Sequence, residues 1–203
     1  MNGAVTQPRT GSAIRSPKVV ERRARIRASL IEIGARLFAE RGVEHVSVED
    51  IIEQAGISRR TFYGFFANKY ELVGSILNPV LEAGAKRLKQ LPGQDAAQLL
   101  PGIVECYLEL WNEYAHALSL IASVDAAALP YIDNGHRKFG AALIKALRIA
   151  ERAAQLRNSS AEDSFKVLTR TAIPLLKIYG NQVDGPALYR DSMLALLGAQ
   201  GTD

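Results

Sequence analysis

The sequence is poor in the residues that build disulfides, metal sites and redox centres. It has 203 residues but one cysteine, Cys106, and three histidines. A single thiol excludes a disulfide within the chain and any zinc site built from several thiolates. We therefore expect no metal, no cofactor and a reducing, cytoplasmic location.

Long apolar runs are also missing. No stretch approaches the ~20 consecutive apolar residues needed to cross a bilayer, and the N-terminus lacks the apolar core of a secretion signal. Hydrophobic residues make up 48% and charged residues 23%, which is the balance of a globular protein with one or two modest domains. We expect no membrane partner.

The usual catalytic motifs are absent as well. The chain has no His-Glu-x-x-His motif, no phosphate-binding glycine loop and no nucleophile elbow, and its histidines and cysteine are scattered. We expect no catalytic residue, so a helical enzyme is the less favoured alternative.

Positive charge is concentrated near the N-terminus. Residues 1–69 carry 12 Lys and Arg against 7 Asp and Glu, a net charge of +5, whereas residues 70–203 carry 13 against 14, a net charge of −1. This asymmetry favours a polyanionic partner at one end of the molecule.

The stretch between residues 47 and 72 predicts two short helices joined by a tight turn. Ser47 can cap a helix that begins at Val48, and Gly56 can adopt the positive φ that ends it. Ser58 then offers the same capping chemistry to a second helix, Arg59 to Phe66. Two helices with such a turn form a helix-turn-helix, whose second helix can enter the DNA major groove.

The second helix divides its side chains between two roles. Its phenylalanines (Phe62, Phe65 and Phe66) follow helical spacing and can bury against the first helix. The remaining residues are basic, polar or small and stay on the outer face, namely Arg59, Arg60, Thr61, Tyr63 and Gly64. Arginine can pair with guanine, the threonine methyl can touch thymine, and tyrosine can donate to a phosphate. The alternative to a DNA-binding role is an ordinary helical hairpin whose arginines are simply solvated.

This stretch resembles the DNA-binding domain of the TetR family of bacterial transcriptional regulators. The resemblance rests on residues at fixed spacing: Ser47, Val48, Asp50, Ile51, Ala55, Gly56, Ile57, Ser58, Thr61, Phe62, Tyr63, Phe66, Lys69 and Leu72. It covers about the first third of the chain. Arg60, Phe65 and Tyr70 depart from the residues that the family often has, so the operator sequence cannot be taken from relatives.

The resemblance implies which residues contact DNA. We expect these to be Ser47, Ser58, Arg59, Arg60, Thr61, Tyr63, Gly64 and Lys69, the last in the position of a phosphate-contacting lysine of the family.

Before the motif, the composition of residues 1–17 predicts a flexible arm. The apolar spacing that follows predicts a helix from about Val19 to Arg41. Arg9, Arg15 and Lys18 could follow the DNA backbone, or the arm could have no role. Four arginines, at positions 22, 23, 25 and 27, cluster in the first half of the helix, and we expect at least one to contact a phosphate.

After the motif, a helix is predicted from about Lys69 to Gln90, and it closes at Pro92 and Gly93. Pro79 lies within this helix, so a kink or a break near Asn78 is plausible. The segment from Ala96 to Leu120 then carries an aromatic stripe. It can line a ligand cavity or fill the core. The tentative ligand residues are Cys106, Tyr107, Trp111 and Tyr114.

The remaining chain predicts a loop or broken helix over residues 122–135 and a helix from about His136 to Leu156. His136 could lie at a pocket entrance or on the plain surface, and we favour the surface. Two further helices, near 163–179 and 186–197, carry apolar stripes, the first capped by Asp163 and bent at Pro174. They could pair with a second copy of the chain in a four-helix interface, or bury within one monomer.

We therefore expect an all-α protein. An arm (1–17) and an N-terminal three-helix helix-turn-helix domain (18–68) precede a larger helical ligand-binding and dimerisation domain (69–203). The leading hypothesis is a homodimeric repressor of a palindromic double-stranded DNA operator, released by a small apolar or aromatic inducer. A ligand-independent DNA-binding protein is the alternative.

Overall fold

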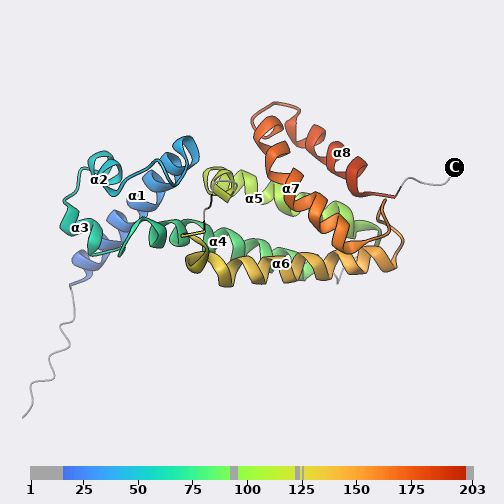
Figure 1. Cartoon of the computed structure of the whole chain (residues 1–203), viewed down its shortest axis with the longest axis horizontal. Helices are drawn as coiled ribbons and strands as arrows, with labels where there is room; N and C mark the ends of the chain where they lie inside the picture. The colour runs from blue at the N-terminus through green and yellow to red at the C-terminus, as the bar shows by residue number, and fades with distance from the viewer. Residues whose placement is uncertain (1–15, 92–95, 122–123, 125, 200–203) are drawn as a thin grey trace, which may run out of the picture.

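The computed structural model describes residues 16–91, 96–121, 124 and 126–199, and the described residues form an all-helical molecule (Figure 1). In order, the α-helices are α1 (Pro17–Arg41), α2 (Val48–Ala55), α3 (Arg59–Tyr63), α4 (Lys69–Gln90), α5 (Leu99–Ile121), α6 (Leu129–Arg152), α7 (Ala161–Tyr179) and α8 (Gly185–Leu197), with a short 3-10 helix, η2 (Ala96–Gln98), before α5. The predicted all-α class is confirmed. Arg9 and Arg15 of the expected arm, and the helix stop at Pro92 and Gly93, lie outside the described residues.

The helices fall into a small group and a large group connected by α4. Helices α1 to α3 lie together at one end, and α4 runs from them along α6, beneath α5, α7 and α8 (Figure 1). The α1 helix packs on both α4 and α5. At Gly34 a Cβ would approach the Leu72 side chain to 2.7 Å, so glycine allows α1 and α4 to lie close together. One apolar core therefore runs from α1 into the larger group.

Two boundaries near the N-terminus differ from the sequence prediction. The α1 helix begins at Pro17, two residues early, because proline suits a first helical turn whose amides lack intrahelical partners. The α3 helix ends at Tyr63 instead of Phe66. Glycine disfavours a helix interior, and the chain turns at Gly64 so that Phe66 is buried beside Phe62, with ring centroids 5.8 Å apart.

The α6 helix begins at Leu129, so the predicted start at His136 is wrong. Proline by itself favours a loop, but Pro130 lies in the first turn of α6, where a missing N–H costs nothing. The helix also ends earlier than predicted, at Arg152, and Ala154 follows with a φ of 53°. Leu156 lies beyond it in an isolated antiparallel bridge to Gly198.

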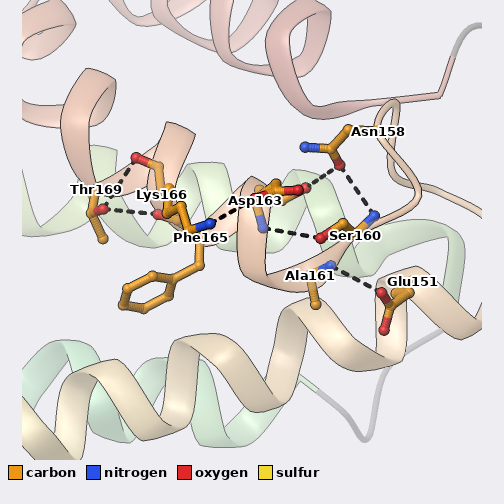
Figure 2. Close-up of polar contacts among 9 residues, drawn as sticks. Glu151, Asn158, Ser160, Ala161, Asp163, Phe165, Lys166 and Thr169 are labelled. Atoms are coloured by element: carbon orange, nitrogen blue, oxygen red, sulfur yellow. Dashed lines mark hydrogen bonds and ion pairs between the residues drawn. The ribbon is translucent and has the colours of Figure 1, made fainter.

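The cap of α7 is Ser160 and not Asp163. The Ser160 hydroxyl accepts a hydrogen bond from the Asp163 amide at 3.1 Å, and the Ala161 amide donates to the Glu151 carboxylate at 3.0 Å (Figure 2). Both bonds satisfy amides that the first helical turn leaves free. The Asp163 carboxylate instead pairs with Lys166 on the helix surface.

Neither internal proline ends a helix. The α4 helix continues through Pro79, and α7 continues through Pro174. The Lys69–Gln90 bounds predicted for α4 are confirmed.

Candidate nucleic-acid interface and cavity

The helix-turn-helix is set by three short-range features. Ser47 and Asp50 form a capping box at the start of α2, in which the Asp50 amide donates to the Ser47 hydroxyl at 3.1 Å and the Ser47 amide donates to the Asp50 carboxylate at 2.8 Å. Gly56 ends α2 in the left-handed region, with φ 60° and ψ 36°. Ser58 then caps α3 by accepting from the Thr61 amide at 3.2 Å. These bonds fix where α3 begins and the direction in which it leaves the turn.

The side chains of α3 separate into a buried and an exposed face. Phe62 is completely buried, whereas Arg59, Arg60, Tyr63 and Gly64 are exposed. The Tyr63 ring stands edge-on to Phe62, with centroids 5.5 Å apart, and is 48% exposed. Thr61 is half-buried, and its hydroxyl lies 2.8 Å from that of Ser58. The outer face of α3 is therefore basic and aromatic, as the sequence predicts.

Arg59 makes an ion pair across the turn with Glu49 of α2. Both side chains are more than half exposed, so the pair lies at the surface. A carboxylate beside an arginine restricts the directions in which the guanidinium can point. Glu49 was missed by sequence reasoning because the two residues are ten positions apart on different helices.

Arg23 of α1 contacts the segment that follows α3, and Arg27 of α1 contacts α4. Arg23 donates to the Gly64 carbonyl at 3.1 Å, and its guanidinium lies 4.5 Å from the Phe65 ring centroid. Arg27 donates to the Ser75 hydroxyl at 3.1 Å. These two arginines bring positive charge next to α3 while supporting it.

Lys69 has a different environment from the one implied by the family resemblance. Its ammonium donates to the backbone carbonyls of Val43 at 2.7 Å and Val46 at 2.9 Å, and lies 3.3 Å from that of Glu44. Three backbone acceptors match the three donors of an ammonium group. The side chain therefore connects the start of α4 to the loop between α1 and α2.

A small cavity of about 130 Å³ lies among α4, α5, α6 and α7. Most of its wall is aliphatic, and the aromatic and polar side chains that line it are Tyr107, His136, Phe139, Phe165 and Thr169. Tyr107 meets Phe139 edge-on, with centroids 5.9 Å apart. Burial raises the pKa of the Tyr107 hydroxyl well above its usual value, so the group stays protonated.

The structure brings only one of the four tentative ligand residues to this cavity. Tyr107 lines it, whereas Trp111 is buried against Gly180. Cys106 faces the Gly84 carbonyl at 3.9 Å, and desolvation raises the pKa of its thiol to about 12. Tyr114 departs from helical geometry, with φ −139° and ψ 36°, and lines a separate cleft of about 530 Å³ among α1, α4 and α5.

The sequence favours a surface position over a pocket entrance for His136 and an association face for Phe165, whereas both residues line the cavity. Each of those predictions rests on the pattern of one helix alone. No local pattern indicates that α5, α6 and α7 converge there.

Residues 30–76 match the model of the bacterial regulatory proteins of the tetR family. The DNA-binding part of the chain therefore belongs to the TetR family. The match covers the end of α1, the helix-turn-helix and the first turns of α4.

Curated transcriptional regulators match about half of the chain or less. The chain is 33% identical over 87 residues to the transcriptional regulator TtgR of Pseudomonas putida, a match that covers 43% of this chain and 41% of TtgR. It is 33% identical over 105 residues to the transcriptional repressor KstR2 of Mycobacterium tuberculosis, covering 51% of this chain and 52% of KstR2. The chain thus spans about half the length of the curated relatives that it matches.

Solved structures share the fold over most of the chain. The ketosteroid regulator KstR2 of M. tuberculosis superposes with a TM-score of 0.70 at 20% identity, covering 86% of this chain and 95% of that structure. SmeT, solved in complex with triclosan, gives a TM-score of 0.63 at 20% identity, covering 87% and 95%. At such identities the likeness establishes the fold alone.

The described residues offer neither a membrane span nor a cluster of metal ligands. None of their helices combines the length and apolarity required to cross a membrane. Within the same residues, no cluster of three or more His, Cys, Asp or Glu side chains is placed to hold a metal ion.

Proposed function

We propose that this TetR-family regulator is a homodimeric repressor that binds a palindromic DNA operator and releases it when a small apolar ligand occupies the cavity. Residues 18–68 would form the DNA-binding part and residues 69–203 the ligand-binding and dimerisation part. The relatives TtgR and KstR2 are named as a regulator and a repressor of transcription, which supports the regulatory role.

The DNA-binding proposal rests on the division of α3 into one buried face and one exposed, basic face. Capping by Ser58 and burial of Phe62 hold the helix rigidly, while Arg59, Arg60 and Tyr63 face solvent. A short rigid helix with outward arginines can place guanidinium groups at guanine edges and a tyrosine hydroxyl at a phosphate. Arg22 and Arg25, which are exposed on α1, are suited to flanking phosphates.

Exposed apolar side chains support self-association through α7 and α8. Ile178 of α7 is 58% exposed and Val183, between the two helices, is 99% exposed, while Leu188 and Leu196 of α8 are 42% and 44% exposed. The inner faces of both helices are occupied by the monomer core, so these side chains remain for a second copy. A twofold dimer would place two α3 helices about one DNA turn apart, roughly 34 Å, as a palindromic operator requires.

Ligand-dependent release requires that the ligand binds the released form more tightly than the DNA-bound form. The α6 helix is suited to this coupling because it lines the cavity and also contacts α4. Tyr131 at its first turn accepts a hydrogen bond from Asn68, the residue that caps α4, at 2.8 Å.

The central experiment selects genomic DNA fragments with the purified protein and then measures affinity for the selected site. Arg59→Ala should weaken specific binding by about 10- to 100-fold, as expected for loss of a paired arginine–base contact worth ~1–3 kcal/mol. Arg148→Ala is the matched control, because Arg148 is also exposed and paired, with Glu162, but lies on α6. Equal affinities of the two variants would contradict the proposal.

Selection also separates this proposal from the ligand-independent alternative. A single high-affinity palindrome supports a specific repressor. Binding to many unrelated fragments with equal affinity would indicate a general DNA-binding protein instead.

A further inference from the structure

The cavity among α4 to α7 is small compared with most ligand pockets. Drug-sized ligands occupy roughly 300–1,000 Å³, whereas this cavity measures about 130 Å³. Its volume is close to the ~150 Å³ of an engineered apolar cavity that binds benzene. The space therefore matches one six-membered ring with a small substituent.

The wall chemistry favours an uncharged ring. Phe139 of α6 and Phe165 of α7 contribute aromatic surface, and none of the described lining residues is a lysine or arginine. A carboxylate placed there would lose its hydration without gaining a cationic partner. Figure 2 shows the Phe165 ring projecting from α7 towards α6.

Polar groups lie where the cavity meets solvent. His136 and Thr169 line it and are both exposed, whereas Tyr107 is 5% exposed. The Thr169 hydroxyl donates to the Phe165 carbonyl at 2.8 Å, which leaves its oxygen free to accept a hydrogen bond from a ligand (Figure 2). A ligand hydroxyl at this end could donate to Thr169 or exchange hydrogen bonds with His136, while the ring stays among the apolar side chains.

We propose that the cavity binds a neutral, single-ring aromatic molecule with one hydroxyl group, the phenol class, with its ring beside Phe139 and Phe165 and its hydroxyl directed to His136 and Thr169. This inference rests on the proposed function, since it names the ligand class of the site through which release would occur. Molecules with two fused rings exceed the space.

The test compares three probes by titration calorimetry on the full chain: p-cresol, toluene and 2-naphthol. We expect p-cresol to bind at least tenfold more tightly than toluene, which has the ring but lacks the hydroxyl. We expect no measurable binding of 2-naphthol. Binding of 2-naphthol as tightly as p-cresol, or equal affinities of p-cresol and toluene, would overturn the inference.

Gly140 provides a variant that fills the cavity without disturbing its wall. It lines the cavity, and a Cβ at this position would meet only the Phe165 ring, at an ordinary 3.8 Å. Gly140→Leu should abolish p-cresol binding, and Gly140→Ala should weaken it by about fivefold or more. Ala141→Leu is the control, because the neighbouring Ala141 is exposed and does not line the cavity.

The two Gly140 variants keep the test decisive. If Gly140→Leu fails to fold, Gly140→Ala still measures the loss. Unchanged p-cresol affinity in Gly140→Ala would place the ligand elsewhere and overturn the inference.

DNA affinity is measured on the same samples without ligand. Specific DNA binding combined with no p-cresol binding would refute the ligand class and leave the DNA-binding proposal intact. Loss of specific DNA binding in the wild-type chain would instead contradict the proposed function.

Discussion

At the scale of single residues, short polar side chains cap the starts of four helices, two of which form the helix-turn-helix. Ser47, Ser58, Asn68 and Ser160 each accept a hydrogen bond from an amide three residues ahead. Each such cap contributes about 1 kcal/mol. Because α2 and α3 have only eight and five residues, they depend on these caps more than long helices do.

The capping box of α2 should make stability depend on pH. The hydroxyl and amide of Ser47 donate to the Asp50 carboxylate and hold its pKa below the usual 3.8, with Arg41 adding to the effect. Because the pKa of Asp50 is lower in the folded state, its ionised carboxylate stabilises the fold above pH 3.8. This stabilisation is lost as the pH falls through the pKa of the folded state.

The prediction is checked with Asp50→Asn. The difference in urea midpoint between wild type and variant should be constant from about pH 5 to 7 and should shrink below the ordinary carboxyl pKa. A difference that does not change with pH would show that the charge of Asp50 plays no part.

Tyr189 carries a buried hydroxyl whose removal should not cost stability. Its side chain is completely buried, and among the described residues its hydroxyl has no hydrogen-bond partner. Tyr189→Phe keeps the ring and removes only this group, so the free energy of unfolding should stay equal or rise by up to ~1 kcal/mol. Urea denaturation measures it, and a loss of more than ~1 kcal/mol would reveal a partner for the hydroxyl.

At the scale of elements, the start of α4 is where several segments meet. Lys69 reaches the loop between α1 and α2, Asn68 reaches Tyr131 of α6, and Gly74 allows α6 to approach so closely that a Cβ would lie 2.8 Å from the Tyr131 carbonyl. A shift of α4 or α6 therefore changes the support of the helix-turn-helix.

Lys69→Met should distinguish a supporting role from a phosphate contact. Loss of the bonds to backbone carbonyls should destabilise the protein by ~1.5–3 kcal/mol and weaken operator binding. The slope of log affinity against log salt concentration should stay at the wild-type value. A decrease in the slope by about 0.9 would instead show that Lys69 neutralises a phosphate.

Tyr131→Phe should loosen the contact between α6 and the cap of α4. The substitution removes the acceptor of the 2.8 Å bond from Asn68 and keeps the ring. We expect faster hydrogen exchange at the first-turn amides of α4, Glu71 among them, without global destabilisation. Tyr179→Phe on α7 is the control, and equal exchange rates in both variants would contradict the prediction.

At the scale of the whole molecule, the exposed apolar residues of α7 and α8 predict the oligomeric state. Leu196→Glu and Ile178→Glu should convert a dimer to a monomer, because each would place a carboxylate in an apolar interface. Sedimentation velocity measures the change. Leu129→Glu is the control, because Leu129 is 50% exposed but lies at the start of α6.

The same variants should weaken operator binding because a monomer brings only one α3 to a two-part site. Variants that stay dimeric would move the interface to another surface.

The sequence by itself determined the features that depend on residues three or four positions apart. These features include the all-helical class, the Ser47 cap of α2, the left-handed Gly56 and the division of α3 into a buried Phe62 and an exposed Arg59. A cap or a helical face needs only one turn of chain, so its chemistry is complete within the local sequence.

Only the tertiary structure decided which distant side chains meet. In the folded chain Glu49 lies beside Arg59, and Lys69 donates to backbone carbonyls. Tyr107 lines a cavity together with His136 and Phe165. Trp111 and Cys106 are buried in the core instead. The α6 start at Leu129 was also missed, since Pro130 indicates a loop until its place in the first turn is known. Such neighbours depend on how α4, α5, α6 and α7 pack together, and that packing follows from the summed burial of many side chains rather than from any single motif.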